Sequence, residues 1–184
     1  MELSWEQLEN LYLSNIQSYI FILFYTIKIK VRRNFKLIHQ NAIFFNRELN
    51  SQDEVFHFLS KKSIELGIAT NEESVYKGFI KREQQGTTGM MDGFAIPHTK
   101  SKEILTPSII IVRLEKGLDW NSMDGKPTSF IISLLIPDNE AGTTHLKILA
   151  SIARMLMKAD IKESLLLATS EQEIETILNN YLKQ

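Results

Sequence analysis

The chain has 184 residues, no cysteine, and 21 basic against 22 acidic residues, for a formal net charge of -1. This balance excludes a whole-chain attraction to nucleic acid, and the lack of cysteine excludes disulfides, thiolate metal sites and a cysteine nucleophile. With 43% apolar and 23% charged residues, the composition suits one globular domain.

The N-terminal region is the least domain-like part of the chain. A dense apolar run, Tyr19 to Tyr25, is followed by basic residues from Lys28 onward. A secretory signal would carry its charges before such a run, and a spanning helix needs about 20 mostly apolar residues. We therefore expect residues 1–36 to be an extension, either an apolar helix or strand or the product of a mis-assigned start codon. Membrane insertion is the less favoured alternative, and self-association through this segment would hide the run.

Helix-start patterns, a Ser, Thr or Asp followed three residues later by Glu, recur four times after residue 50. Each pattern offers an N-cap side chain and a reciprocal carboxylate. The patterns are Ser51-x-x-Glu54, Thr70-x-x-Glu73, Asp160-x-x-Glu163 and Ser170-x-x-Glu173. They predict helices over about 52–66, 72–85, 161–168 and 171–182. A further helix is expected from Thr144 to Lys158.

Apolar runs rich in β-branched residues predict the strands. Residues 108–114 and 129–136 form near-continuous runs, which are typical of strands covered on both faces. Residues 38–45 are a weaker strand candidate and residues 93–96 a short one. Because helices precede and follow these strands, we expect an α/β fold: a three-layer sandwich with a mixed central β-sheet flanked by helices on both faces.

The segment Met91 to Thr99 places His98 directly behind Pro97, at the end of the short predicted strand. Pro97 fixes its own φ and biases Ile96 toward extended conformations, which restrains the histidine. An imidazole with an unperturbed pKa of about 6.5 is substantially neutral at cytoplasmic pH, so one nitrogen has a lone pair that can attack phosphorus. A lone histidine beside an apolar strand is nevertheless more often a hydrogen-bonded structural residue.

Three motifs in order carry a family resemblance: residues 81–89 (KREQQGTTG), 91–99 (MDGFAIPHT) and 143–149 (TTHLKIL). They resemble the enzyme IIA domain of the fructose/mannitol branch (type 2) of the bacterial sugar phosphotransferase system. Arg82, His98 and His145 match the arginine, active histidine and accessory histidine of that family. The resemblance covers roughly residues 37–182, so we expect residues 37–184 to form an enzyme IIA domain.

The resemblance implies a protein-histidine phosphotransferase. His98 would accept a phosphoryl group from the phosphocarrier protein HPr and pass it to a cysteine of a IIB component for sugar uptake. It also implies a cytoplasmic location, no nucleotide or metal cofactor, no nucleic acid, and contact with the membrane only through the IIC permease. The alternative is a regulatory, nitrogen-type enzyme IIA that controls partner proteins by its phosphorylation state. The sugar and the phosphorylated ring nitrogen stay open.

The same resemblance implies roles for the neighbours of His98. His145 would bind phosphoryl oxygens or orient His98, and Arg82 would spread positive charge over the transferring group. Thr87 and Thr88 would donate hydroxyls to phosphate, and Glu83 would hold a neighbour in place. The alternatives are a capping or core histidine, a cation at a helix C-terminus and ordinary turn residues.

Competing functions have little support in the sequence. The chain lacks the glycine-rich phosphate loop of nucleotide hydrolases and the HExxH pattern of zinc proteases. Its four histidines are too scattered to predict a metal site from spacing. Trp120 is expected to pack in a loop between two strands rather than to stack on a sugar.

Overall fold

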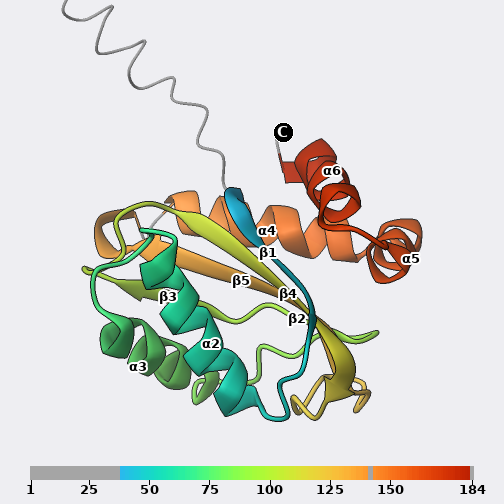
Figure 1. Cartoon of the computed structure of the whole chain (residues 1–184), viewed down its shortest axis with the longest axis horizontal. Helices are drawn as coiled ribbons and strands as arrows, with labels where there is room; N and C mark the ends of the chain where they lie inside the picture. Colours follow the sequence, from blue (N-terminus) through green and yellow to red (C-terminus); the bar gives the residue numbers. More distant parts are fainter. Residues whose placement is uncertain (1–37, 141–142, 183–184) are drawn as a thin grey trace, which may run out of the picture. The chain divides into compact units, whose positions relative to one another are not determined.

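The β-branched runs of the sequence form the centre of a mixed sheet in the computed structural model, which describes residues 38–140 and 143–182 (Figure 1). The strands are β1 (Ile38–Arg47), β2 (Phe94–Ala95), β3 (His98–Ser101), β4 (Ser108–Leu118) and β5 (Thr128–Pro137). The helices are α2 (Gln52–Glu65), α3 (Glu72–Glu83), α4 (Thr143–Leu156), α5 (Ala159–Leu167) and α6 (Glu171–Leu182), with a short 3-10 helix at Asp138–Glu140.

The order of the strands is β1-β4-β5-β2. β3 also pairs with β5, further along that strand than β2 does. β4 and β5 are antiparallel, while β1 is parallel to β4, and both β2 and β3 are parallel to β5. The two central strands bury alternate residues on opposite faces. Ile109 and Ile111 pack with residues of α4, α5 and α6, whereas Ile110 and Val112 pack with residues of α2 and α3. The predicted three-layer sandwich with a mixed sheet is confirmed.

Two of the four predicted helix caps are confirmed. The hydroxyl of Ser51 accepts the backbone N–H of Glu54 at 3.1 Å, and α2 begins at the next residue. The hydroxyl of Ser170 accepts the backbone N–H of Glu173 at 3.2 Å at the start of α6. In both places the side chain satisfies a donor that the first turn leaves without a helical partner.

The other two caps were predicted at the wrong residues. Thr70 does not cap α3, because its hydroxyl donates to the carboxylate of Glu103 at 2.5 Å; Asn71 is the cap. α5 begins after Lys158, which makes no side-chain cap, so Asp160 lies within the first turn. There its carboxylate faces the positive end of the helix dipole without acting as the cap.

The prediction that His98 ends the short strand was wrong. β2 stops at Ala95, and His98 opens the separate strand β3. Pro97 has no N–H to donate to a ladder, and the N–H of Ile96 turns away to the carbonyl of Thr88 at 2.9 Å. The pairing with β5 resumes at Pro97, whose carbonyl accepts the N–H of Leu134 at 3.0 Å.

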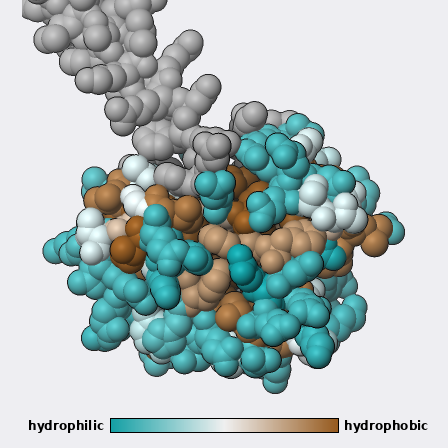
Figure 2. Space-filling model, viewed as in Figure 1, coloured by the Kyte–Doolittle hydropathy of each residue, from teal (hydrophilic) through white to brown (hydrophobic). Residues whose placement is uncertain are grey.

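On the face shown in Figure 2, hydrophobic patches lie between hydrophilic residues. No helix within residues 38–140 and 143–182 is long and apolar enough to cross a membrane. Residues 1–36, which we expect to form an extension that self-associates or docks, lie outside the described residues, which begin at Ile38.

Candidate functional site

His98 is half-buried at the start of β3, and its own backbone neighbourhood orients the ring. Its Nδ1 lies 2.9 Å from the carbonyl oxygen of Ile96. A carbonyl oxygen can only accept a hydrogen bond, so Nδ1 carries the proton and Nε2 carries the lone pair. Pro97, which lies between the two residues, limits the backbone rotation that would break this contact.

Arg82 reaches His98 from the last turn of α3. Its Nε donates to Nε2 of His98 at 2.8 Å, and its Nη1 donates to the carbonyl oxygen of Gly86 at 2.8 Å. An N–H donor can face Nε2 only when that nitrogen has a lone pair. Arg82 and Ile96 therefore indicate the same tautomer independently. The structure thus brings together two of the residues named from the family motifs, Arg82 and His98.

The approach of α3 to β3 depends on a glycine. A Cβ added at Gly78 would lie 2.0 Å from Oγ1 of Thr99, far inside any normal contact. One turn earlier, the hydroxyls of Ser74 and Ser101 lie 2.8 Å apart across the same interface. Small side chains on both elements thus bring the helix that carries Arg82 against the strand that opens with His98.

We predict that Gly78→Ala destabilises the protein although alanine favours a helix by about 1 kcal/mol. Overpacking a buried contact costs about 1–3 kcal/mol, and the Thr99 side chain is buried. Urea unfolding should show a net loss of stability. The double variant with Thr99→Ala, which lacks the clashing hydroxyl, should recover part of that loss. Equal stability of Gly78→Ala and the wild type would contradict this packing account.

Glu83 holds the loop that follows α3. Its carboxylate accepts the backbone N–H of Thr88 at 3.0 Å, the Thr88 hydroxyl at 2.5 Å and the side-chain amide of Gln52 at 3.0 Å. The indole N–H of Trp120 donates to the same Thr88 hydroxyl at 3.1 Å. This geometry is the one expected of a residue that positions its neighbours. Gln52 had no signal in the sequence beyond its place at a helix start.

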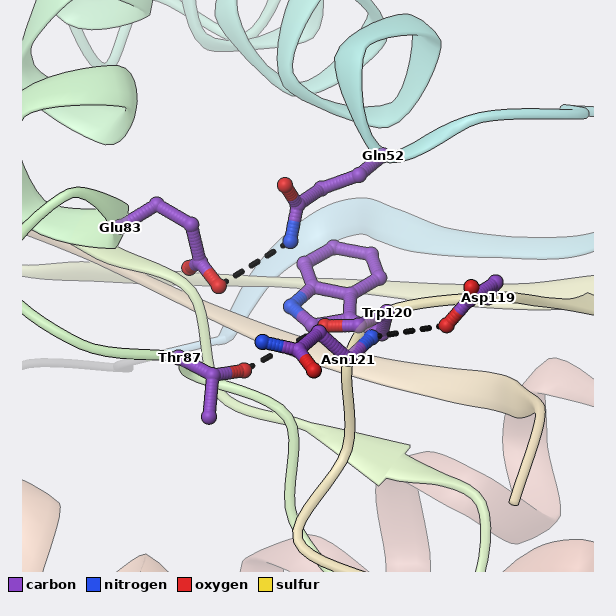
Figure 3. A pocket seen from close by; sticks show the side chains of 6 residues that line it. All are labelled: Gln52, Glu83, Thr87, Asp119, Trp120 and Asn121. Atoms are coloured by element: carbon purple, nitrogen blue, oxygen red, sulfur yellow. Dashed lines mark hydrogen bonds between the residues drawn. The ribbon is translucent and has the colours of Figure 1, made fainter. Parts of the chain in front are cut away.

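Thr87 takes part in the same network. Its hydroxyl donates to the carbonyl of Trp120 at 3.3 Å and accepts the N–H of Gly89 at 3.0 Å. Both threonine hydroxyls therefore donate to protein acceptors in this structure. A pocket of about 240 Å³ opens beside them, lined by Gln52, Glu83, Thr87, Asp119, Trp120 and Asn121 (Figure 3).

Trp120 packs as expected from the sequence. Only 1% of its surface is exposed, and its ring meets the Phe56 ring edge-on with the centroids 5.6 Å apart. The buried indole packs against Phe56 of α2, and its N–H bonds the Thr88 hydroxyl in the loop held by Glu83. Its burial leaves no open ring face for a sugar.

His145 lies in the first turn of α4, as predicted. Its side chain lies outside what the structure describes. Ile148, Ile152 and Leu156 of the same helix are buried in the core cluster that packs against the sheet. Among the described residues, no group of three or more His, Asp or Glu side chains is placed to hold a metal ion.

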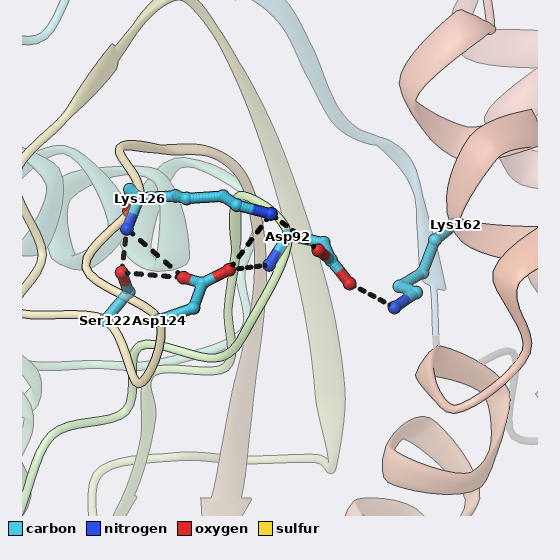
Figure 4. Close-up of polar contacts among 5 residues, drawn as sticks. All are labelled: Asp92, Ser122, Asp124, Lys126 and Lys162. Atoms are coloured by element: carbon cyan, nitrogen blue, oxygen red, sulfur yellow. Dashed lines mark hydrogen bonds and ion pairs between the residues drawn. The ribbon is translucent and has the colours of Figure 1, made fainter.

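Asp92 anchors the turn that leads into β2 and His98. Its carboxylate accepts from Lys126 at 3.1 Å and from Lys162 of α5, and its backbone N–H donates to Asp124 at 2.9 Å (Figure 4). Asp92 has a positive φ of 60°, a conformation that Asp tolerates better than most residues. The cluster links the turn both to the β4–β5 connection, through Asp124 and Lys126, and to α5, through Lys162.

This cluster predicts sensitivity to acid. The pKa of Asp124 is lowered from its ordinary 3.8 to about 2, chiefly by the backbone N–H of Asp92. The pKa of Asp92 is also lowered, first by its hydrogen bond from Lys162 and then by that from Lys126. A carboxyl with a lowered folded pKa stabilises the fold above its ordinary pKa and loses that contribution as the pH falls through the folded value.

We therefore expect the free energy of unfolding to fall between about pH 4 and pH 2, in part through these two carboxyls. In urea unfolding at several pH values, Asp124→Asn should flatten this pH dependence. Asp138→Asn, at an exposed position after β5, is the matched control. The same slope for Asp124→Asn and the wild type would contradict the prediction.

The five-stranded mixed sheet between two helical layers is the fold of enzyme IIA proteins of the phosphotransferase system. Residues 36–181 match the family model described as phosphoenolpyruvate-dependent sugar phosphotransferase system, EIIA 2. The chain therefore belongs to this family of phosphocarriers, which act as phosphotransferases. This confirms the resemblance found in the sequence.

Two relatives and one solved structure show the range of the family. A nitrogen regulatory protein of Bradyrhizobium diazoefficiens is 36% identical over 142 residues, covering 77% of this chain and 92% of the relative. The fructose-specific EIIA component of Haloferax volcanii is 30% identical over 128 residues, covering 70% of this chain and 82% of the relative. The crystal structure of the nitrogen regulatory protein IIA-Ntr of Neisseria meningitidis has a TM-score of 0.70 at 29% identity, covering 74% of this chain and 92% of that one.

Other relatives are much longer than this chain. It matches only 22% of the length of the 2-O-alpha-mannosyl-D-glycerate-specific EIIABC component of Escherichia coli, with 29% identity over 145 residues. The family thus occurs both as separate proteins and as one part of larger ones.

Proposed function

We propose that Nε2 of His98 accepts a phosphoryl group from phosphorylated HPr and passes it to a cysteine of a IIB component of a sugar permease, in a fructose- or mannitol-like branch. The carrying observation is the contact of Arg82 Nε with Nε2 of His98, 2.8 Å apart. Together with the contact of Nδ1 with Ile96, it indicates that Nε2, the nitrogen facing the Arg82 guanidinium, carries the lone pair.

The transfer step forms a bond between phosphorus and Nε2 of His98, while the bond between phosphorus and the donor histidine breaks. The donor nitrogen keeps the electron pair of the broken bond. The proton on Nδ1 stays hydrogen-bonded to the carbonyl of Ile96, whose partial negative charge stabilises the cationic phosphorylated ring. Arg82 gives up its contact with the lone pair and turns its donors to the phosphoryl oxygens. The thiolate of the acceptor then attacks phosphorus. The bond between phosphorus and Nε2 breaks, and its electron pair returns to Nε2.

The neighbouring residues support this step in our proposal. His145 stands in the first turn of α4, where backbone N–H groups favour an anion. Glu83 fixes the loop through Thr88, so that the Gly86 carbonyl can hold Arg82. Thr87 and Thr88 would serve as phosphate donors by exchanging their present acceptors for a phosphoryl oxygen.

A regulatory role is the second candidate. It is favoured by the 36% identity with the nitrogen regulatory protein of Bradyrhizobium diazoefficiens over nearly its whole length. In this alternative the same phosphohistidine switches the affinity for a partner protein and feeds no sugar. Both candidates use His98 and Arg82, so the acceptor alone separates them.

Reconstituted transfer tests the proposal. The protein is incubated with phosphoenolpyruvate, enzyme I and HPr, and then with purified IIB components of the fructose and mannitol type. Transport predicts labelled protein that loses its label rapidly to one IIB. Labelled protein that transfers to none of them would favour regulation, and failure to accept label from HPr would contradict both.

A further inference from the structure

A second hollow lies between the C-terminal half of α4 and the last turn of α6, with a volume of about 230 Å³. Its lining residues are Ser151, Arg154, Met155, Lys158 and Tyr181. Arg154 follows His145 by nine residues, which corresponds to roughly 14 Å along the helix axis. None of the lining residues takes part in the contacts of His98 and Arg82 described above. The hollow is therefore separate from the site of the proposed transfer.

The hollow carries two positive charges and no carboxylate. Arg154 is exposed on α4, and Lys158 is exposed just beyond the end of that helix, where it precedes α5. Neither forms an ion pair in the described part of the chain. Four lysines of the described part do pair with carboxylates, namely Lys62, Lys77, Lys126 and Lys162. The C-terminus of α4 favours a nearby cation, but two cations beside one hollow leave an excess of positive charge.

The two cations are held on the walls of the hollow. Nη2 of Arg154 donates to the Ser151 hydroxyl at 3.1 Å, and Nζ of Lys158 lies 4.8 Å from the centre of the Tyr181 ring. These contacts restrict side chains that would otherwise move freely in solvent. The hydroxyls of Ser151 and Tyr181 add neutral donors. Lys158 is also the N-cap residue of α5 and gives that helix no side-chain cap.

We propose that this hollow, the Arg154–Lys158 hollow, binds the phosphate group of a small phosphate monoester. Phosphate matches the planar fork of an arginine and the point charge of a lysine, and the lack of a lining carboxylate removes the repulsion that would oppose it. The volume is below the range of about 300–1,000 Å³ usual for drug-sized ligands, so the hollow suits a phosphate group with a compact remainder.

The test is an NMR titration of the full chain with inorganic phosphate, with glycerol 3-phosphate and with sulfate. The amides of residues 151–158 and the Tyr181 ring report on the hollow, and the His98 ring reports on the transfer site. We expect saturable shifts at the hollow at millimolar ester that persist in His98→Ala. Arg154→Gln and Lys158→Gln should each weaken binding at least about 10-fold, because each removes a charged hydrogen bond. Lys61→Gln, at an exposed lysine of α2, is the matched control and should bind as the wild type does.

The three ligands distinguish the source of the phosphate. Tighter binding of the ester than of inorganic phosphate supports the proposal in full, and equal binding of the two supports a phosphate site that takes the free ion. Equal binding of sulfate and the ester would overturn specificity for phosphate monoesters. No shifts at residues 151–158, or shifts unchanged by Arg154→Gln, would overturn the proposal. Loss of phosphoryl transfer leaves this titration unaffected, so the two proposals fail separately.

Discussion

His98→Ala should accept no phosphoryl label from phosphorylated HPr, whereas the wild type should acquire a label that is labile to acid and stable to base. The reason is that Nε2 of His98 is the nitrogen whose lone pair faces Arg82, and the chain has no cysteine as a second acceptor. The measurement is incorporation of radioactive phosphate from phosphoenolpyruvate through enzyme I and HPr. The expected change is a complete loss of stable labelling.

His57→Ala is the matched control for removing an imidazole. His57 lies exposed on α2, and its ring stacks on Tyr76 with centroids 4.0 Å apart, away from the contacts of His98. This variant should label as fast as the wild type. Label that persists in His98→Ala would mean that a different residue carries the phosphoryl group.

Replacement of Arg82 should slow transfer strongly without removing the acceptor. Arg82→Ala removes the donor that faces Nε2, and the loss of one oriented donor to transition-state charge costs on the order of 10²-fold in rate. Arg82→Lys keeps the charge but loses the planar guanidinium that donates to both His98 and Gly86. Its transfer rate should therefore also fall. Rapid-quench measurement of phosphorylation by HPr gives the rates.

Lys81→Ala is the control for charge alone, because Lys81 is the exposed neighbour of Arg82 on α3. It should transfer within a few-fold of the wild-type rate. Unchanged rates in both Arg82 variants would remove this residue from the transfer step. A slow Arg82→Ala whose fold was also less stable would need comparison with Gly78→Ala, which disturbs the same helix without removing the guanidinium.

The sequence predicted the elements whose signals are local. The runs that became β4 and β5 are apolar at nearly every position, because both faces of these strands are covered. The caps at Ser51 and Ser170 depend on contacts within four residues. The cap at Thr70 failed because Glu103, more than thirty residues away, takes its hydroxyl.

The site required the structure for its atomic detail. Family motifs assigned Arg82, His98 and His145 to one site, but no sequence pattern could predict which ring nitrogen of His98 faces Arg82. That assignment comes from the Ile96 carbonyl, which the break at Pro97 leaves beside Nδ1. β3 was missed because its four residues, His98–Ser101, are largely polar and form a strand by pairing with β5. Gly78 gave no signal, because its role depends on the approach of a neighbouring strand.

The position of the phosphoryl group on the imidazole tests the central claim most directly. The protein is labelled with nitrogen-15 in its histidines, phosphorylated through HPr, and studied by two-bond proton–nitrogen correlation spectra. We predict that Nε2 of His98 bears the phosphorus while Nδ1 keeps its proton and its hydrogen bond to Ile96. Phosphorus on Nδ1 of His98, or on His145, would contradict the account.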